Sequence, residues 1–316
     1  MPVPDTAKAA QLRELLSQPL VCDLDLSGAD LTDIVLDNVR LERVSLRGAN
    51  LEGARFEHCT WISCDLSQAN FSNCTALNWY LSDCKLDQAD FAGASLDHGR
   101  WLRCVGDSTR LVGARLEGLE VIEGQFSCLD LQRSTMTRCQ WGGCVLAALL
   151  GVDATYIQAR FNACRLENAK FTASMLQNCA LEECTFNGVD FSQAVATMTS
   201  LYLSQGEGLN FNLARFTQCL FTRAQMPFAN FTQAHLEGSN FAGANLASSS
   251  FDEAFLRYAS FDGAQLCHAS FMAADLAGAD FNGAELSDCS WHHSNCEAVC
   301  PADRERQAAL SWVPTL

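Results

Sequence analysis

The chain has few basic residues, with 21 Lys and Arg against 37 Asp and Glu among 316 residues, so its net charge is −16. A protein that follows nucleic-acid phosphates needs clustered basic side chains, so the composition disfavours direct nucleic-acid binding. The same acidity disfavours docking on anionic lipid. Long apolar stretches are also missing. The longest run, residues 144–152, is too short for a transmembrane helix.

Signals for export and catalysis are missing too. The first 18 residues lack a basic segment followed by an apolar one, so we expect no signal peptide and a cytoplasmic location. Neither the phosphate-binding pattern G-x-x-x-x-G-K-[ST] nor the nucleophile pattern G-x-S-x-G occurs. The six histidines and the many aspartates fall at regularly spaced polar positions and suggest no catalytic pair. We therefore predict a protein that is not an enzyme and has no cofactor.

What the sequence has in abundance is a five-residue repeat. From Leu26 to Trp291 every fifth residue falls on one register, and 41 of these 54 positions are Leu or Phe. The residue two positions before a large one is in most units small, usually Ala or Cys, and the other three positions are mostly polar. The unit is small–polar–large–polar–polar, as in residues 279–283, ADFNG.

A period of five fits neither an α-helix nor a simple strand. It fits a short strand followed by a corner. Residues two apart on a strand point to the same side, so the small and large residues both face inward. The polar residues between them, rich in Gly, Asn, Asp and Ser, are suited to turning the chain. Repetition of this unit predicts a solenoid with a filled interior.

The number of walls per coil follows from a second period. From Phe231 to Leu286 the large residues alternate strictly between Phe and Leu. A four-walled coil of 20 residues stacks Phe on two opposite walls and Leu on the other two, whereas a three-walled coil would mix them. Six cysteines from Cys64 to Cys184, separated by multiples of 20, agree with four walls. The repeat then makes about 13 coils.

These units resemble the pentapeptide-repeat family, whose pattern A(D/N)Lxx is matched at residues 29–31 (ADL), 49–51 (ANL) and 89–91 (ADF). The resemblance covers about residues 22–298. It implies an all-β solenoid, a right-handed quadrilateral parallel β-helix. Some members, to which the resemblance is more distant, imitate B-DNA in shape and charge, bind DNA gyrase or topoisomerase IV, and give resistance to fluoroquinolones and other topoisomerase poisons.

We predict three segments: an N-terminal helical cap at 1–21, the solenoid at 22–298, and a C-terminal cap or tail at 299–316. Caps are expected because a solenoid exposes sheet edges at both ends. Residues 5–18 have the composition of an amphipathic helix, with Asp5 or Thr6 as its N-cap. The residues after Pro301 predict a second short helix, which either covers the last coil or forms the contact of a homodimer. The protein is then a monomer or a homodimer.

Small residues at the large position mark places where a wall could be irregular. Residues 196–208 contain two of them, Ala196 and Gly206, followed by a Gly-Glu-Gly sequence. This stretch is either a loop or an ordinary wall around Leu201. Pentapeptide-repeat proteins often use such loops for contacts, so the resemblance makes a loop here a candidate contact. Gly106 and Gly151 are weaker candidates for the same irregularity.

The polar surface is uneven in charge. Residues 224–303 contain ten acidic residues and one basic residue, Arg257, whereas arginines are scattered through the N-terminal half. We predict a protein-interaction scaffold or adaptor with an unidentified protein partner. The alternatives are a DNA-mimicking topoisomerase binder and a secreted bacterial effector. The partner-binding candidates are Tyr202, Gln205, Glu207, Glu237, Asp252, Glu253, Asp262, Asp275 and Asp280.

Twelve of the 17 cysteines occupy the small inward position, where we expect free thiols packed as small apolar residues. One cluster has spacing suited to zinc: Cys289, His292, Cys296 and Cys300. Cys289 and Cys296 fall on inward positions while His292 faces outward. We therefore predict no metal site and keep these four residues as the alternative.

Overall fold

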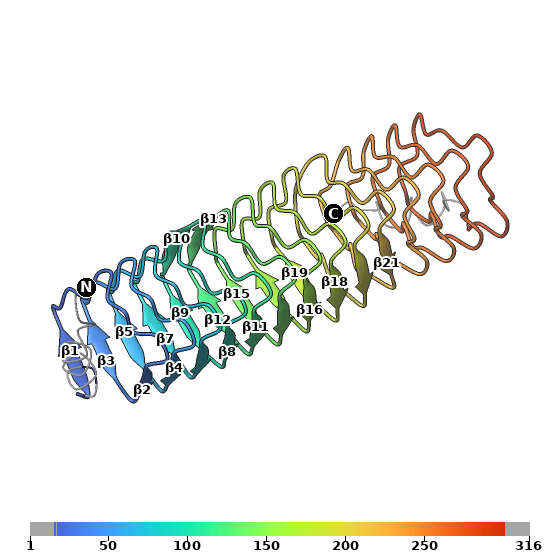
Figure 1. Ribbon diagram of the computed structural model, residues 1–316. Coiled ribbons are helices and arrows are strands. Elements are labelled where there is room, and N and C mark those ends of the chain that lie inside the picture. The colour runs from blue at the N-terminus through green and yellow to red at the C-terminus, as the bar shows by residue number, and fades with distance from the viewer. Residues whose placement is uncertain (1–15, 17, 301–316) are drawn as a thin grey trace, which may run out of the picture. The chain divides into compact units, whose positions relative to one another are not determined.

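The computed structural model describes Leu16 and residues 18–300, which form an all-β parallel solenoid (Figure 1). The chain comprises two compact units, Met1–Leu166 and Glu167–Leu316, here called unit 1 and unit 2. All strands have three residues, and the middle residue of each is buried. This is the pattern expected when the large residue of each repeat faces inward.

Unit 1 has two long walls of parallel strands. The first consists of β1 (Leu20–Cys22), β3 (Arg40–Glu42), β5 (Thr60–Ile62), β7 (Tyr80–Ser82), β9 (Arg100–Leu102), β12 (Glu120–Ile122), β15 (Gln140–Gly142) and β17 (Arg160–Asn162). The second consists of β2 (Val35–Asp37), β4 (Arg55–Glu57), β6 (Thr75–Leu77), β8 (Ser95–Asp97), β11 (Arg115–Glu117), β14 (Thr135–Thr137) and β16 (Thr155–Ile157). Paired residues are 20 apart, as in Leu41 and Trp61, so one coil contains 20 residues.

The other two walls of unit 1 complete the square. One carries the short pair β10 (Val105–Asp107) and β13 (Gln125–Ser127), and otherwise both are joined by single bridges such as Asp25 to Ser45 and Asp30 to Asn50. Bridged positions therefore recur every five residues around a coil, four times per turn. This confirms the predicted four walls.

Unit 2 begins with β18 (Met175–Gln177), β19 (Ala180–Glu182), β20 (Val195–Thr197) and β21 (Arg215–Thr217). After β21 successive coils are joined by isolated bridges, such as His235 to Phe255. Counted in regular strands, the solenoid has about ten turns, fewer than the predicted 13. The difference arises because some walls consist mostly of a turn. Such a wall pairs with the next coil through a single residue, so it is not counted as a strand.

The corners explain the polar part of the repeat. In the turn from Leu26 to Ala29 the Ala29 amide donates to the Leu26 carbonyl at 3.0 Å, and Gly28 has a φ of 67°. These are the features of a type II turn, which requires a positive φ at its third residue. The equivalent position recurs every five residues with φ near the same value, for example at Asp33 and Asn38. The preference for Gly, Asn and Asp follows from this conformation.

The interior of unit 2 contains two columns of stacked aromatic rings. One runs through Phe211, Phe231 and Phe251 with centroids 4.6 and 4.7 Å apart and rings within 6° of parallel. The other runs through Phe241 and Phe261, 4.9 Å apart. Rings of the two columns meet edge to face, a favourable aromatic geometry. This confirms that Phe occupies two opposite walls.

Residues 196–208 form an ordinary wall of the solenoid and not a loop. Leu201 is buried, and Gln205 bridges to Gln225 in the next coil. Gly206 fits because a Cβ there would lie 2.7 Å from the carbonyl carbon of Phe186, so the two backbones approach closely where the large side chain is missing. Gly106 likewise lies within β10, where the side chains of Thr109 and Phe126 fill its place.

The predicted helical caps lie almost wholly outside the described residues. Of the N-terminal segment the structure describes Leu16, which is buried, and residues 18–21. Residues 301–316 lie outside as well. Among the residues that are described, no helix has the length and apolar character needed to cross a membrane.

Candidate interaction surfaces

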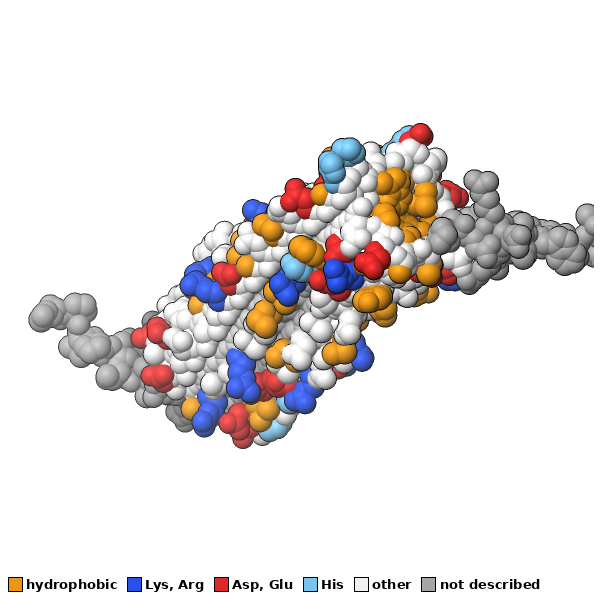
Figure 2. Space-filling view, turned by 90° about the vertical axis from the view of Figure 1, so that its right-hand side faces the viewer, with side chains coloured by type: hydrophobic (Ala, Val, Ile, Leu, Met, Phe, Trp, Pro, Cys, Tyr) orange, Lys and Arg blue, Asp and Glu red, His pale blue; other side chains and the backbone are white. Residues whose placement is uncertain are grey.

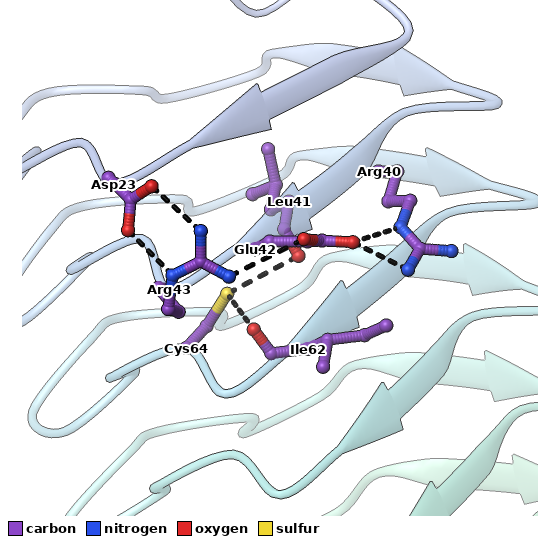
Figure 3. A network of polar contacts seen from close by, with 7 residues as sticks. All are labelled: Asp23, Arg40, Leu41, Glu42, Arg43, Ile62 and Cys64. Carbon is purple, nitrogen blue, oxygen red and sulfur yellow. Dashed lines mark hydrogen bonds and ion pairs between the residues drawn. The ribbon is translucent and has the colours of Figure 1, made fainter.

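Charged side chains in unit 1 pair between successive coils, because positions 20 apart are neighbours. Arg43 donates from Nε to Asp23 Oδ1 at 2.6 Å and from a terminal nitrogen to Oδ2 at 2.7 Å (Figure 3). Arg103 and Asp83 repeat this arrangement three coils later. The hydrogen bonds from arginine lower the pKa of both carboxyls. Some of the arginines scattered through the N-terminal half are thus engaged with acids of the same wall.

The cysteines contribute no reactive site on the inside. All 17 are free thiols, and the Cys64 thiol donates to the carbonyl oxygens of Leu41 and Ile62 at 3.7 and 3.5 Å (Figure 3). Burial raises the pKa of Cys74 to about 12, and it does the same for Cys139. A thiol held in its neutral form is a poor nucleophile and a poor metal ligand.

One candidate surface lies on unit 2, along the wall that continues from β21. Outward side chains 20 residues apart form one column there, which consists of Met175, Val195, Arg215, His235, Phe255, Asp275 and Asn295. Beside it run the corner residues Leu213, Gln233, Glu253 and Ala273. The residue between corner and column points inward, so a groove of about 450 Å³ forms over Ala254. We call it the Phe255 groove.

The polar side chains of the Phe255 groove are held by their neighbours. His235 stacks on Phe255 with ring centroids 4.4 Å apart, and its Nδ1 lies 3.3 Å from Glu237 Oε1. The amide of Gln233 donates to Glu253 at 2.8 Å. Because the stack and the hydrogen bonds fix these side chains, less conformational entropy is lost when a partner binds.

Acid predominates around the groove. Arg257 donates to Asp275 at 2.5 Å, and Asn295 donates to the same carboxylate at 2.9 Å. Burial pushes the pKa of Asp275 up, but the hydrogen bonds from Arg257 and the Ala277 amide outweigh this, so the pKa lies below its usual value. Asp275 is therefore ionised at neutral pH. Glu253, in contrast, receives its hydrogen bond from a neutral amide.

Of the nine predicted partner-binding residues, the structure brings Glu253 and Asp275 together in the Phe255 groove, with Glu237 beside them through His235. Gln205 and Glu207 line a separate shallow hollow of about 220 Å³ on another wall. The remaining four line neither hollow. They are Tyr202, Asp252, Asp262 and Asp280. Asp252 accepts hydrogen bonds from Ser270 and the Met272 amide, which gives it a role within the wall.

The four cysteine and histidine residues of the C-terminal cluster are not brought together. Cys289 donates to the Leu266 carbonyl at 3.0 Å, Cys296 contacts Ser294, and His292 lies against His293. The stretch from Cys289 to Cys300 covers more than half of a 20-residue coil. Its ligands therefore point from different walls, although they are close in sequence.

Sequence reasoning missed the apolar and aromatic part of the groove, namely Leu213, His235 and Phe255. A signal was present, since 17 of the 19 Phe occupy the large inward position and two do not. Those two are Phe228 and Phe255, which are 60% and 42% exposed. Figure 2 shows hydrophobic side chains of this kind standing among scattered charged ones on one face of the molecule. A phenylalanine outside the repeat register was thus a marker for a surface site.

Comparison with known families agrees with the geometry. The family described as a pentapeptide repeat region matches residues 54–129, 134–211 and 214–291, and pentapeptide repeats in eight copies match 25–60. Together these matches cover more than half of the chain. No curated protein matches the chain.

Three solved structures are similar over much of the chain, all at low identity. HetL, a pentapeptide repeat protein involved in heterocyst differentiation regulation from the cyanobacterium Nostoc, is 18% identical over 95% of this chain and 96% of its own, with a TM-score of 0.28. QnrB1, a plasmid-mediated fluoroquinolone resistance protein, is 18% identical over 65% and 97%, with a TM-score of 0.38. The catalytic unit of an α-1,3-glucanase from Streptomyces thermodiastaticus is 10% identical over 93% and 66%, with a TM-score of 0.33. Scores this low carry no argument about function.

Proposed function

The chain belongs to the pentapeptide-repeat family, and from that premise we propose that it is a non-enzymatic scaffold that binds a protein partner on its outer walls. Its large repeat residues are almost all buried, so they serve the fold. Recognition then falls to the outward side chains. Rigid repeat surfaces of this kind are well suited to extended contacts with partners.

The Phe255 groove is the observation that carries this proposal. It combines exposed apolar side chains, Leu213 and Phe255, with the carboxylates of Glu253 and Asp275. Buried aromatic contacts ringed by polar groups are the common make-up of energetically important positions in protein interfaces. We propose that the partner inserts an apolar side chain beside Phe255 and places a basic residue near Glu253.

Affinity capture with the full-length chain tests the scaffold. Phe255→Gln removes the aromatic contact, and we expect it to abolish recovery of at least one partner that the unchanged chain recovers. Val35→Gln is the matched control, because Val35 is an exposed apolar residue at the same position of a coil in unit 1. Equal recovery by the two variants, or recovery of no partner by the unchanged chain, would argue against the scaffold.

A second candidate is a DNA-mimicking binder of gyrase or topoisomerase IV, and the charge of unit 2 supports it. Residues 224–303 have ten acidic residues against Arg257 alone. A basic DNA-binding groove would be attracted to such a surface. The test is a gyrase supercoiling assay with and without a fluoroquinolone. DNA mimicry predicts inhibition at micromolar protein that weakens when Glu253 and Asp262 are changed to amides, whereas an unaffected supercoiling rate eliminates it.

A further inference from the structure

A pair of like charges lies side by side near the N-terminal end of unit 1. The register of β2 and β4 places Asp37 directly beside Glu57 in the next coil. Like charges in such opposed positions are destabilising. Several other neighbours along the walls of unit 1 have opposite charge, as in Asp23 with Arg43 and Asp90 with Arg110. Asp37 with Glu57, like Asp97 with Glu117 on the same wall, is instead a pair of carboxylates.

An imidazole completes a cluster with this pair. His58 follows Glu57 at a corner with a φ of 53°, and its Nδ1 lies 3.7 Å from Asp37 Oδ1. One ligand atom from each of Asp37, Glu57 and His58 lies within 4.8 Å of the other two. Within residues 18–300 this is the one group of three potential metal ligands that approach so closely. Asp37 and His58 are exposed and Glu57 is half-buried, so an ion can reach the cluster from solvent.

The neighbouring side chains leave the charge of the pair largely uncompensated. Asn38 donates to Asp37 Oδ1 at 2.8 Å, but its amide is neutral. Arg55 Nε lies 3.7 Å from Glu57 Oε1, and the Arg55 side chain is 60% exposed. Exposed ion pairs at such a distance contribute little. A cation held between the two carboxylates would relieve their repulsion more directly.

We propose that Asp37, Glu57 and His58 bind one divalent first-row transition-metal ion, such as Zn²⁺ or Co²⁺. Two carboxylate oxygens and one imidazole nitrogen form a mixed ligand set that suits these ions, whereas Mg²⁺ and Ca²⁺ prefer oxygen alone. Water fills the remaining positions. The ligands stand on two strands and a corner of the solenoid, so little ordering is needed when the ion binds.

Binding at this position has a structural consequence. Asp37 belongs to one coil, and Glu57 and His58 belong to the next, so the ion joins two successive coils through side chains. Because a metal that binds the folded state alone adds its binding free energy to stability, the site makes the N-terminal coils of unit 1 more resistant to unfolding when it is occupied.

The test uses the full-length reduced protein and Co²⁺ as the probe, followed by calorimetry and absorption spectroscopy. We expect one Co²⁺ per chain without the thiolate-to-cobalt absorption that cysteine ligands would produce. His58→Asn and Glu57→Gln should each weaken binding by about tenfold or more. All three ligands are on the surface, so circular dichroism should show both variants folded.

The chain offers a matched control at His98, which stands at the same corner position two coils later. Leu77 occupies the place that corresponds to Asp37, and Asp97, His98 and Glu117 are not a group whose ligand atoms all lie within 4.8 Å of one another. His98→Asn should therefore leave Co²⁺ binding unchanged. The proposal is overturned by the absence of binding at millimolar Co²⁺, by equal affinities of His58→Asn and the unchanged chain, or by a thiolate absorption band.

Discussion

The rings of Phe231 and Phe251 lie 4.7 Å apart and 2° from parallel, one coil apart in the interior of unit 2. Phe211 and Phe271 continue the column on either side, and all four side chains are fully buried. Each ring thus has an aromatic neighbour above and below. In so regular a column the backbone cannot collapse locally without disturbing several coils.

Truncation of this column should be costly. Phe251→Ala should lower the free energy of unfolding by about 3–5 kcal/mol, because it removes a buried ring and leaves a cavity. Phe251→Leu should cost clearly less, since Leu fills the equivalent place on the adjoining walls. Urea denaturation followed by circular dichroism measures both. Phe255→Ala is the control and should cost less than about 1 kcal/mol because Phe255 is exposed. Similar losses of stability in Phe251→Ala and Phe255→Ala would contradict the placement of Phe251 in the interior.

Ser204 occupies the small inward position of its repeat, and its hydroxyl is hydrogen-bonded inside the solenoid. The Ser204 hydroxyl donates to the Leu181 carbonyl at 2.6 Å and accepts from the Cys184 amide at 3.2 Å. Ser204→Ala should therefore cost about 1–2 kcal/mol in urea denaturation, as the carbonyl loses its buried donor. Alanine fits sterically, since Ala224 occupies the same place one coil later. The thiol of Ser204→Cys is a weaker donor, so the stability of this variant should lie between those of the unchanged chain and Ser204→Ala. An alanine variant as stable as the unchanged chain would show that the bond adds nothing.

The sequence predicts the solenoid well because the neighbours of each side chain are always 20 residues away. The alternation of Phe and Leu after Phe231 was enough to predict four walls. It could not predict which walls hold strands. Leu31 in a turn wall and Leu36 in β2 have the same inward pattern, and only the backbone of the intervening corner distinguishes them.

The same 20-residue rule explains what was and was not foreseeable about the sites. Glu253 and Asp275 were predicted as acidic surface, but the groove also needs His235 stacked on Phe255, which depends on the column. Asp37 and Glu57 are 20 apart and are neighbours. In contrast, Cys289 and Cys296 are close in sequence and separate in space, because a coil directs successive residues to different walls.

The corners allow backbone conformation to be tested apart from side-chain contacts. Gly113 has a φ of 64°, and a Cβ added there would meet no atom within 4 Å. Gly113→Ala should lower the free energy of unfolding by about 1 kcal/mol, because alanine is strained in the left-handed conformation. Gly113→Asn should lower it less, and Gly113→Val, with its β-branched side chain, should lower it most. Thermal melting of the three variants measures the order. Gly142→Ala is the control, since Gly142 is equally open but lies in β15 without a positive φ, and it should be neutral or slightly stabilising. Equal effects at 113 and 142 would count against the assigned corner.

The buried thiols should make the protein sensitive to alkaline pH. Burial raises the pKa of Cys74 to about 12 from an ordinary 9.0, so the unfolded chain loses this proton at lower pH than the folded one. The stability due to the buried thiol is therefore complete below about pH 9 and falls as pH rises towards 12, by about 1.4 kcal/mol per pH unit. Urea midpoints across this range measure the loss. Cys74→Ala isolates one thiol, because Ala54 and Ala94 already flank it along the column. The variant should lose less stability than the unchanged chain above pH 9, and identical pH profiles would mean that Cys74 titrates normally in the folded protein.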